Sequence, residues 1–382
     1  MKKPLIITII ILIVILILPT AGFFGWYFKE KKPMNIVILD KTVHSLERSN
    51  HRSLTWVLAN GRIVKEDNKR KYLLRKDYYG FYPLKPLRSK QFRKNDLRLT
   101  ELINIAENNE VLYYADTYGV FFNDWYQGIN RSRRSRKMYG GLNNNDNLLL
   151  AEMKKREKLV ILEHNTFNYP TDAYERYRVE EQFGMSSTGW TGEYYASLSE
   201  KDVPEWLVNI YTKKTREEWT FENAGLVLLK GENDIIVLEE GKHLVSAIPY
   251  IVTNEENSAK YSVASKVAYM GPFDIMDPKQ NSVISDFNID VTPEGMEILD
   301  NNFLSNIFPA VIGGPDSGNH IYLCGDFATG KISPWTACFG SLSKLSSLLY
   351  TDEESDPDRF FWLYYKPLLL GILNDYYETL ER

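Results

Sequence analysis

Three runs of apolar, β-forming residues each end at a carboxylate, and this pattern constrains the fold more than any other feature. The runs are "NIVILDKT" (35–42), "VLYYADTYG" (111–119) and "LVILEHNTF" (159–167), and their acids are Asp40, Asp116 and Glu163. The runs are continuously apolar rather than alternating, which is typical of strands buried on both faces by helices. Helix-like segments at 96–109 and 144–158 lie between them and imply right-handed crossovers. The sequence therefore predicts a mostly parallel α/β sheet covered by helices.

Beyond residue 170 the pattern changes and strands become more frequent. We expect helices over 171–184, 202–214 and 292–303, a hairpin over 224–240, and strands within 262–276, 282–292 and 318–328. A terminal helix over 356–381 should be kinked or restarted at Pro367, which lacks a backbone N–H. We therefore expect one α/β domain over 33–382 that carries a β-rich insertion near 217–290.

The first residues read as a membrane anchor. Residues 4–28 carry no charge, and as a helix they would span about 37 Å, enough for a bilayer core of about 30 Å. The aromatic residues within 23–28 resemble an interfacial belt. A cleaved signal peptide is the alternative, but a cut after Ala21 would place Pro19 where a small residue is needed. We predict an uncleaved anchor and flank over residues 1–32.

The orientation of this anchor follows from the chain on either side of it. Lysines flank both ends of the apolar run in nearly equal number, so charge alone decides little. Because the amino-terminal tail is only three residues long, we expect the tail to stay inside. The predicted location is the cell membrane, with a single pass and an extracytoplasmic C-terminal body.

Composition excludes several classes of function. Outside residues 1–32 the chain has 41 basic and 49 acidic residues, which argues against nucleic acid as a partner. The five histidines form no metal-binding motif, and the sequence has no dinucleotide, Walker or G-x-S-x-G motif. We therefore predict no cofactor and no metal site. For His44 and His51 we expect exposed or capping positions. Cys324 and Cys338 could form a disulfide or remain two free thiols.

The acid-ended strands also predict a ligand site. Ligands of open α/β sheets bind outside the carboxyl ends of the strands. The candidate ligand-binding residues at these ends are Asp40, Lys41, Asp116, Thr117, Glu163, Asn165, Thr166 and Asp326. Carboxylates that share one cleft raise one another's pKa values and can act as acid and base. The alternative is that these side chains only cap nearby loops.

Trp190 is a further ligand-binding candidate. It lies in "STGWTGEYY" (187–195), where Gly189 and Gly192 flank it. An aromatic platform on a flexible loop is one interpretation, since saccharides often bind such rings. A buried tryptophan in a corner of the domain is the other.

The segment "SGNHIYLCGDFA" (317–328) resembles the glycine–strand–Gly-Asp segment of class I glutamine amidotransferase-like domains, which have a flavodoxin-like sheet. Over most of residues 35–328 the chain also resembles a group of uncharacterised bacterial membrane-anchored proteins, through "DKT", "ADTYG", "NTF", "GWTG", "PEWL", "FPAVI" and "GDFA". The catalytic G-x-C-x-G elbow of amidotransferases is absent, and "ILEHNTF", in the equivalent place, has no cysteine. No downstream His–Glu pair is recognisable. The resemblance thus implies the fold but not glutamine hydrolysis.

Together these observations predict a non-catalytic, membrane-anchored extracytoplasmic domain that binds a cell-envelope glycan or a partner protein. No catalytic residue is assigned under this hypothesis. The alternative is a hydrolase that acts on a cell-envelope glycan through the carboxylates of Asp40, Asp116 and Glu163.

Overall fold

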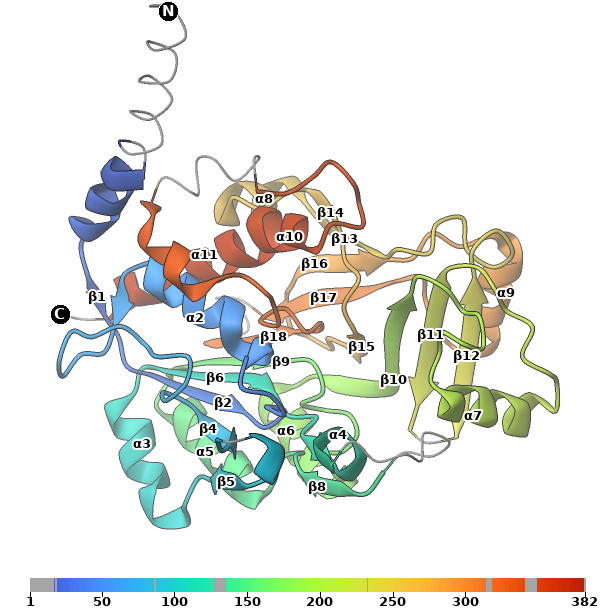
Figure 1. Ribbon diagram of the computed structural model, residues 1–382, viewed down its shortest axis with the longest axis horizontal. Helices are drawn as coiled ribbons and strands as arrows, with labels where there is room; N and C mark the ends of the chain where they lie inside the picture. Colours follow the sequence, from blue (N-terminus) through green and yellow to red (C-terminus); the bar gives the residue numbers. More distant parts are fainter. Residues whose placement is uncertain are drawn as a thin grey trace, which may run out of the picture.

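A ten-stranded sheet forms the centre of the protein (Figure 1). The computed structural model describes residues 17, 19–85, 87–126, 135–231, 233–313, 318–340 and 349–380. The strand order is β14-β13-β16-β17-β18-β9-β6-β2-β4-β5. In chain order these strands are β2 (Ile36–Asp40), β4 (Tyr79–Pro83), β5 (Phe92–Asn95), β6 (Val111–Asp116), β9 (Leu159–Glu163), β13 (Tyr250–Thr253), β14 (Lys266–Ala268), β16 (Val283–Asn288), β17 (Ile307–Gly313) and β18 (His320–Leu323).

Five adjacent strands, β4-β2-β6-β9-β18, run parallel to one another. Numbered by their order in the chain, they read 2-1-3-4-5 across the sheet. The chain therefore leaves β2 toward one side to form β4, and returns to the other side of β2 to form β6. The boundary between β2 and β6 is the topological switch point, where sheets of this kind bind ligands. The predicted α/β architecture is confirmed, but the sheet is mixed rather than mostly parallel, because β13, β14, β16 and β17 on one side and β5 on the other extend it with antiparallel pairings.

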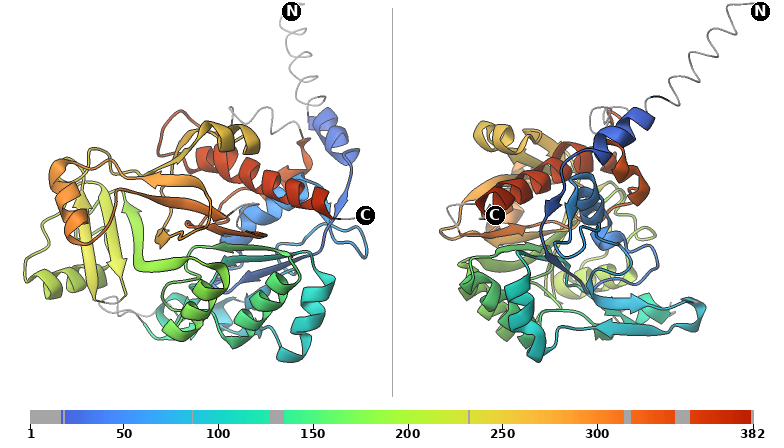
Figure 2. Two further views of the ribbon diagram at one scale, coloured as in Figure 1. Left: turned by 180° about the vertical axis from the view of Figure 1, so that it is seen from behind. Right: turned by 90° about the vertical axis from the view of Figure 1, so that its left-hand side faces the viewer.

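Helices cover both faces of this sheet (Figures 1 and 2). On one face lie α3 (Leu102–Asn108), α5 (Asn144–Lys155) and α6 (Ala173–Phe183); on the other lie α2 (Arg52–Asn60) and α11 (Lys366–Thr379). The sequence sets the start of α5 through a capping box, in which Asn143 accepts from the Asp146 amide and Asp146 accepts from the Asn143 amide. Both faces of the parallel strands are therefore buried, as their continuous apolar runs predict.

The terminal helix is interrupted where Pro367 predicts it. Pro357–Phe360 forms α10, Phe361–Tyr365 forms a π-helical turn, and α11 follows with Pro367 in its first turn. Pro367 has no N–H to donate to the carbonyl of Leu363, four residues earlier, so the regular α-helical ladder cannot continue through this point.

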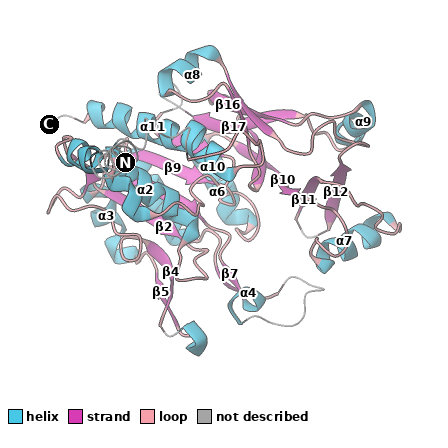
Figure 3. Ribbon diagram, turned by 45° about the horizontal axis from the view of Figure 1, so that its top comes forward, coloured by secondary structure: helices cyan, strands magenta, loops and turns pink. Residues whose placement is uncertain are grey.

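A second, four-stranded antiparallel sheet lies beside the first (Figures 1 and 3). Its order is β12-β11-β10-β15, formed by β10 (Ser186–Tyr195), β11 (Gly225–Lys230), β12 (Asp234–Glu239) and β15 (Phe273–Asp277). The helix α7 (Glu205–Thr215) packs on one face through Leu207, and α9 (Pro293–Asn301) lies near β12. The predicted hairpin over 224–240 is β11–β12. The β-rich segment 217–290 divides its strands between the two sheets rather than forming one insertion.

Shorter elements complete the described chain. They are β1 (Lys32–Pro33), β3 (Ile63–Val64), β7 (Val120–Phe121), β8 (Lys137–Tyr139), α4 (Phe122–Tyr126), α8 (Glu255–Tyr261) and the 3-10 turns Ser49–His51 (η1), Leu87–Ser89 (η2), Leu99–Glu101 (η3) and Pro334–Cys338 (η5). Two predicted helices begin later than expected. The α-helix within 96–109 starts at Leu102 because η3 precedes it without a side-chain cap, and α7 starts at Glu205 with Pro204 as its N-cap residue.

The predicted anchor lies largely outside the described residues, which include 17 and 19–28 of its span. In the part of the chain that is described, no helix has the length and apolar character to cross a membrane. Residues 19–27 are helical and rest on the body. The Trp26 indole donates to the Ala59 carbonyl at 3.0 Å, and the Arg62 guanidinium donates to the Tyr27 carbonyl at 2.9 Å. Phe24 and Phe28 remain exposed on this segment.

Candidate functional site

The carboxyl edge of the parallel strands gathers an unusual number of buried ionisable groups. Asp40 ends β2, Asp116 ends β6 directly opposite it in register, and Glu163 ends β9. Asp326 follows β18, and Asp274 reaches the same edge from β15 of the second sheet. All these residues except Asp326, which is partly buried, are almost fully buried. The edge therefore holds the acids that the sequence identifies, and one that it does not.

Glu163 is committed to holding a loop. One carboxylate oxygen accepts hydrogen bonds from the amides of Phe327 and Ala328, at 2.9 and 3.0 Å. The other bonds the Tyr113 hydroxyl, which also contacts the Tyr365 hydroxyl at 2.9 Å. Burial and the charge of Asp326 raise the pKa of Glu163 well above its usual range, against these hydrogen bonds. For Glu163 the structure thus supports the interpretation as a loop cap.

Asp40 is paired with His51, which corrects the expectation that this histidine is exposed or caps a helix. The ring is 1% exposed, and its Nδ1 atom lies 2.5 Å from Asp40 Oδ2. Its Nε2 atom lies 2.9 Å from the Leu74 carbonyl. The other Asp40 oxygen accepts from the Thr42 amide at 3.0 Å. Both Asp40 oxygens therefore have partners within the protein.

Lys41 and Thr166 also have structural partners. The Lys41 ammonium lies 2.5 Å from Asp146 Oδ2 and donates to the Gly141 carbonyl at 2.9 Å, which ties the end of β2 to the start of α5. The Thr166 hydroxyl donates to the Glu163 carbonyl at 2.6 Å. These contacts connect loops at the carboxyl edge and leave neither group aimed at a ligand.

A second network surrounds Asp274. Its carboxylate accepts from the Asn168 side chain at 2.7 Å, from the Asn165 amide at 3.1 Å and from the Tyr322 hydroxyl. Asn165 has a φ of 69°, a left-handed conformation that asparagine tolerates better than most residues. This conformation turns the backbone N–H of Asn165 toward Asp274. Asp274 therefore joins β15 of the second sheet to the loop that follows β9.

His164 lies between the two groups of acids. Its Nδ1 atom is 2.8 Å from Asp274 Oδ1, yet the geometry does not form a hydrogen bond. Burial lowers the pKa of His164, but attraction to Asp274, Asp116 and Asp326 outweighs this effect and raises the pKa above its usual value. A positive charge on His164 is thus stabilised by the acids around it.

Asp116 and Asp326 differ from the other acids in their electrostatics. Burial, Asp326 and Asp40 raise the pKa of Asp116 to about 7. Burial raises the pKa of Asp326 to about 6, while a hydrogen bond from Thr329 and the charge of His164 lower it. Because like charges in a shared low-dielectric site resist joint ionisation, the pair retains a proton near neutral pH. This is the behaviour expected of carboxylates in one cleft.

Some buried polar atoms at this edge have no hydrogen-bond partner. Among the described residues these are the Thr117 hydroxyl, Asp326 Oδ1 and His164 Nδ1; the other such atoms lie on Arg48, Arg52, Asn147 and Gln182. A buried polar group without a partner costs about 1–3 kcal/mol, so native proteins rarely retain one without a reason. Both Asp116 oxygens are bonded, to the Asn50 side chain at 3.0 Å and to the Tyr118 backbone N–H at 2.7 Å, so the unused oxygens at this edge are those of Thr117 and Asp326.

Trp190 does not form an exposed platform, so the expectation of an aromatic ring on a flexible loop is wrong. It lies within β10 and is 4% exposed, in contact with the main hydrophobic core. Gly192, two residues later, allows the Phe273 ring to approach, since a Cβ atom there would lie 2.2 Å from that ring. Gly192 therefore serves packing between β10 and β15, whereas Gly189 has a φ of 82° and faces Lys230 of β11; the alternative of a buried tryptophan is correct.

The structure answers whether the two cysteines form a disulfide, which the sequence left open. Cys324 and Cys338 are both free, so the disulfide alternative is wrong. Burial, Asp274 and Asp286 raise the pKa of Cys324 well above its usual value, which suppresses the reactive thiolate. Within the described ranges, no group of three or more histidine, cysteine, aspartate or glutamate residues is arranged to hold a metal ion.

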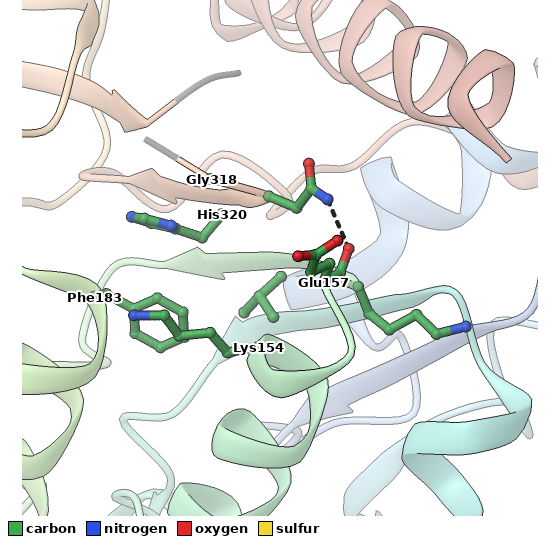
Figure 4. Close-up of a pocket in the computed structure, with 8 residues that line it drawn as sticks. Lys154, Glu157, Phe183, Gly318 and His320 are labelled. Atoms are coloured by element: carbon green, nitrogen blue, oxygen red, sulfur yellow. Dashed lines mark hydrogen bonds between the residues drawn. The ribbon is translucent and has the colours of Figure 1, made fainter. Parts of the chain in front are cut away.

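A separate cavity of about 310 Å³ lies at the opposite, amino edge of β9 and β18 (Figure 4). Its polar groups already have partners. Lys154 donates to the Gln182 carbonyl, Asn319 donates to the Glu157 carbonyl at 2.6 Å, and His320 Nε2 lies 3.1 Å from Asn281 Oδ1. Burial and Lys154 lower the pKa of His320 to about 4, so the ring is neutral at physiological pH. This cavity is therefore a weaker candidate than the carboxyl edge.

Sequence reasoning missed His51, Asp274 and Asn168 as members of the carboxyl-edge network. Asp274 and Asn168 carry no motif, and their positions follow from the packing of the second sheet against the first. His51 offered one usable signal: it stands in the segment directly after β2, so it returns to the same edge as Asp40.

Comparisons with known proteins add little. No protein-family model and no curated protein matches the chain, and so the resemblance to a group of membrane-anchored proteins has no support from them. A solved structure of a ThuA-like protein from Bacteroides uniformis is similar over 92% of this chain and 95% of its own length. At 9% identity and a TM-score of 0.39, that similarity carries no argument about this chain.

Proposed function

We propose that this protein is a membrane-anchored binding module whose α/β body recognises a hydroxyl-rich ligand, a cell-envelope glycan, at the carboxyl edge of its parallel strands. The observation that carries the proposal is the pair of buried, unpartnered oxygens on Thr117 and Asp326. Sugar hydroxyls both donate and accept hydrogen bonds, so one hydroxyl can donate to Asp326 Oδ1 while another pairs with Thr117. The site lies beside the switch point of the sheet, where ligands of such folds bind.

The fold underlying this proposal is amidotransferase-like. The strand order 2-1-3-4-5 is that of flavodoxin-like sheets, to which amidotransferase-like domains belong. The nucleophile of the enzymes is missing from this arrangement. The residue after Glu163, at the end of β9, is His164 rather than cysteine, and Cys324 is fully buried. The proposal therefore assigns recognition, and not glutamine hydrolysis, to the carboxyl edge.

The location is part of the proposal. The uncharged run 4–28 supports a single-pass anchor with an extracytoplasmic body. A reporter fused after Arg382 should be accessible to membrane-impermeant labels on intact cells. Activity of a cytoplasmic reporter at that position, without external labelling, would overturn both the location and the choice of an envelope glycan.

Hydrolysis of such a glycan is the second candidate, because one observation favours it. With pKa values of about 7 and 6, one carboxyl group of the Asp116–Asp326 pair can hold a proton while the other is ionised. That division is what general acid and base catalysis requires. Asp116 accepts hydrogen bonds from the Asn50 side chain and the Tyr118 backbone N–H, as Glu163 and Asp40 accept theirs, but Asp116 and Asp326 have pKa values of about 7 and 6 and would therefore carry the reaction.

A glycan array probed with the full chain in detergent micelles tests both functions. The wild type should bind a subset of glycans, and Thr117→Val and Asp326→Asn should weaken binding at least tenfold. Asp300→Asn, at an exposed position on α9, is the matched control and should bind normally. Release of shortened glycan by the wild type but not by Asp116→Asn would favour hydrolysis. Unchanged binding by both site variants would refute the proposed site.

A further inference from the structure

The outer edge of the second sheet has unused backbone hydrogen-bonding groups. The strand β12 is the first in the order β12-β11-β10-β15 and pairs only with β11. The Glu240 amide donates to the Ala224 carbonyl at 2.9 Å, which sets the alternation of the ladder. Asp234, Ile236 and Leu238 therefore bond to β11, whereas Ile235 and Val237 direct their N–H and C=O groups away from it.

The strand edge closes just beyond these two residues. Glu239 is the next residue with outward groups; its amide donates to His243 Nδ1 at 3.0 Å and its carbonyl accepts from the His243 amide at 2.8 Å. Within the described part of the chain, no corresponding partner exists for the outward groups of Ile235 and Val237. Two donors and two acceptors, about 6.8 Å apart along the strand, are thus left over.

A hollow of about 390 Å³ gives access to this edge. Tyr211 and Lys214 of α7 line one side, Ile298 and Asn302 at the end of α9 line the other, and residues 235–237 form the floor. The side chains of Ile235 and Val237 are buried under α7, so the floor is held in place. We call this hollow the β12 groove.

Residues 235–238 of this edge lack the features by which sheets prevent pairing, although Asp234 at the start of β12 is paired with Lys214 of α7 at 2.9 Å. Exposed edges commonly carry lysine, proline or a bulge. The edge strand β5 of the large sheet follows this rule with Arg93 and Lys94, and β14 does so with Lys266. Residues 235–238 of β12 read Ile-Ile-Val-Leu and pair with β11 without a register shift.

We propose that the β12 groove binds an extended peptide segment of a partner protein, which adds to the second sheet as a fifth strand. Only an extended backbone presents alternating donors and acceptors at the spacing that Ile235 and Val237 require. The side chains of that peptide would point alternately toward Tyr211 on α7 and Ile298 on α9, so apolar residues at alternate positions fit best. The inference is independent of the glycan proposed for the carboxyl edge.

The test uses a phage-displayed library of random dodecapeptides selected against the full chain in detergent micelles. We expect enriched peptides with alternating apolar residues and micromolar affinity. Hydrogen exchange should show rapid exchange of the Ile235 and Val237 amides in the free protein, and at least tenfold slower exchange when a selected peptide is bound.

Two variants at one position separate the backbone from the side chain. Val237→Pro removes the outward N–H and leaves the ladder to β11 intact, because Val237 does not bond to β11. Val237→Ala loses similar packing but keeps the N–H. Val237→Pro should bind the selected peptide at least tenfold more weakly than Val237→Ala. Equal binding by the two variants would overturn the proposal, as would a selection that enriches no peptide.

A third variant keeps the test decisive if Val237→Pro does not fold. Ile298→Glu places a charge on the wall of the groove and leaves the residues of β12 unchanged, and it should also weaken binding at least tenfold. Retained affinity in Ile298→Glu would contradict the proposal. The competing outcome is that two copies of the chain pair through β12. In that case the peptide-free chain would sediment as a dimer, and Val237→Pro would sediment as a monomer. That result would overturn the peptide proposal and identify a second copy as the occupant of the groove.

Discussion

Asp40 Oδ2 lies 2.5 Å from Nδ1 of His51, while the other ring nitrogen, Nε2, faces the carbonyl oxygen of Leu74 at 2.9 Å. A carbonyl only accepts hydrogen bonds, so Nε2 carries a hydrogen. Nδ1 and the Asp40 carboxylate lie within hydrogen-bond distance. The two contacts of His51 together fasten η1 to the end of β2 and to the Leu74 carbonyl.

Removing the imidazole should destabilise the protein strongly. Among the described residues, His51→Phe leaves the buried Asp40 carboxylate with the Thr42 amide as its remaining donor, and loss of one partner of a buried charged pair costs about 3–5 kcal/mol. His51→Gln retains a side-chain N–H that can reach Asp40 and should lose less. Urea unfolding of both variants measures the difference; equal stability of His51→Phe and wild type would show that the pair contributes nothing.

Asp116→Asn should raise stability at alkaline pH and not at acidic pH. The folded-state pKa of Asp116 is raised to about 7, so between pH 4 and 7 the folded state binds a proton that the unfolded state does not. Stability therefore falls as pH rises through this window, and the loss is complete above pH 7. Asp116→Asn cannot ionise and therefore avoids this loss of stability. Its free energy of unfolding at pH 8 should exceed that of wild type by roughly 1–3 kcal/mol, after allowance for weaker hydrogen bonds from the Asn50 side chain and the Tyr118 backbone N–H.

Thermal melts of Asp116→Asn and wild type at pH 4.5 and pH 8 measure this effect. The melting temperature of Asp116→Asn should exceed that of wild type at pH 8, and this difference should shrink toward zero at pH 4.5. Asp300→Asn, at an exposed site, should show neither effect. A lower melting temperature of Asp116→Asn at pH 8 would mean that the acids do not repel one another, and that Asp116 is structural.

Glu163→Gln should fold almost as well as wild type, whereas Glu163→Ala should not. The glutamine oxygen can accept from the Phe327 and Ala328 amides, and its NH2 group can donate to the Tyr113 hydroxyl. Alanine leaves the two amides unsatisfied in the core and leaves the Tyr113 hydroxyl with only the Tyr365 hydroxyl, at a cost of about 3–5 kcal/mol. Denaturant titration at pH 7 compares them. Glycan binding by Glu163→Gln should remain intact, and its loss would restore Glu163 as a ligand-binding residue.

Trp190→Ala should lower stability by about 3–5 kcal/mol, as large-to-small changes in cores do. Trp190→Phe retains much of the buried ring and should lose less. Because the ring is buried in β10, neither variant should change ligand affinity per folded molecule. Binding measured on the folded fraction checks this; a selective loss of affinity would mean that Trp190 touches the ligand.

The parallel half of the fold is predictable because its signals are local. Continuous apolar runs identify β2, β6 and β9, and the acid at the end of each places it at the carboxyl edge. What each acid does there depends on partners that are distant in the chain. Glu163 meets the amides of residues 327 and 328, and Asp40 meets His51. The Glu163 pairing has no sequence signal, and the Asp40 pairing has only the position of His51 in the segment directly after β2.

The second sheet was harder to predict for the same reason. The hairpin over 224–240 has a clear sequence signal, but the sequence of β10 resembles that of a loop because Gly189 and Gly192 interrupt it. Gly192 makes room for Phe273 of β15, a contact between residues far apart in the chain, and Gly189 lies at the irregularity in the β10–β15 register with a φ of 82°. The burial of Trp190 and the arrival of Asp274 at the carboxyl edge both follow from that pairing.

The placement of Asp274 limits how this protein could be taken apart. A segment that resembles an insertion is a natural choice for deletion, in the laboratory or in evolution, and residues 217–290 resemble one. Deleting it would remove β15 and thereby strip His164, Asn165 and Asn168 of their common carboxylate, besides removing β13, β14 and β16 from the large sheet. The chain is consequently not modular at this point, and a shortened homologue that lacked these strands would need a different carboxyl edge.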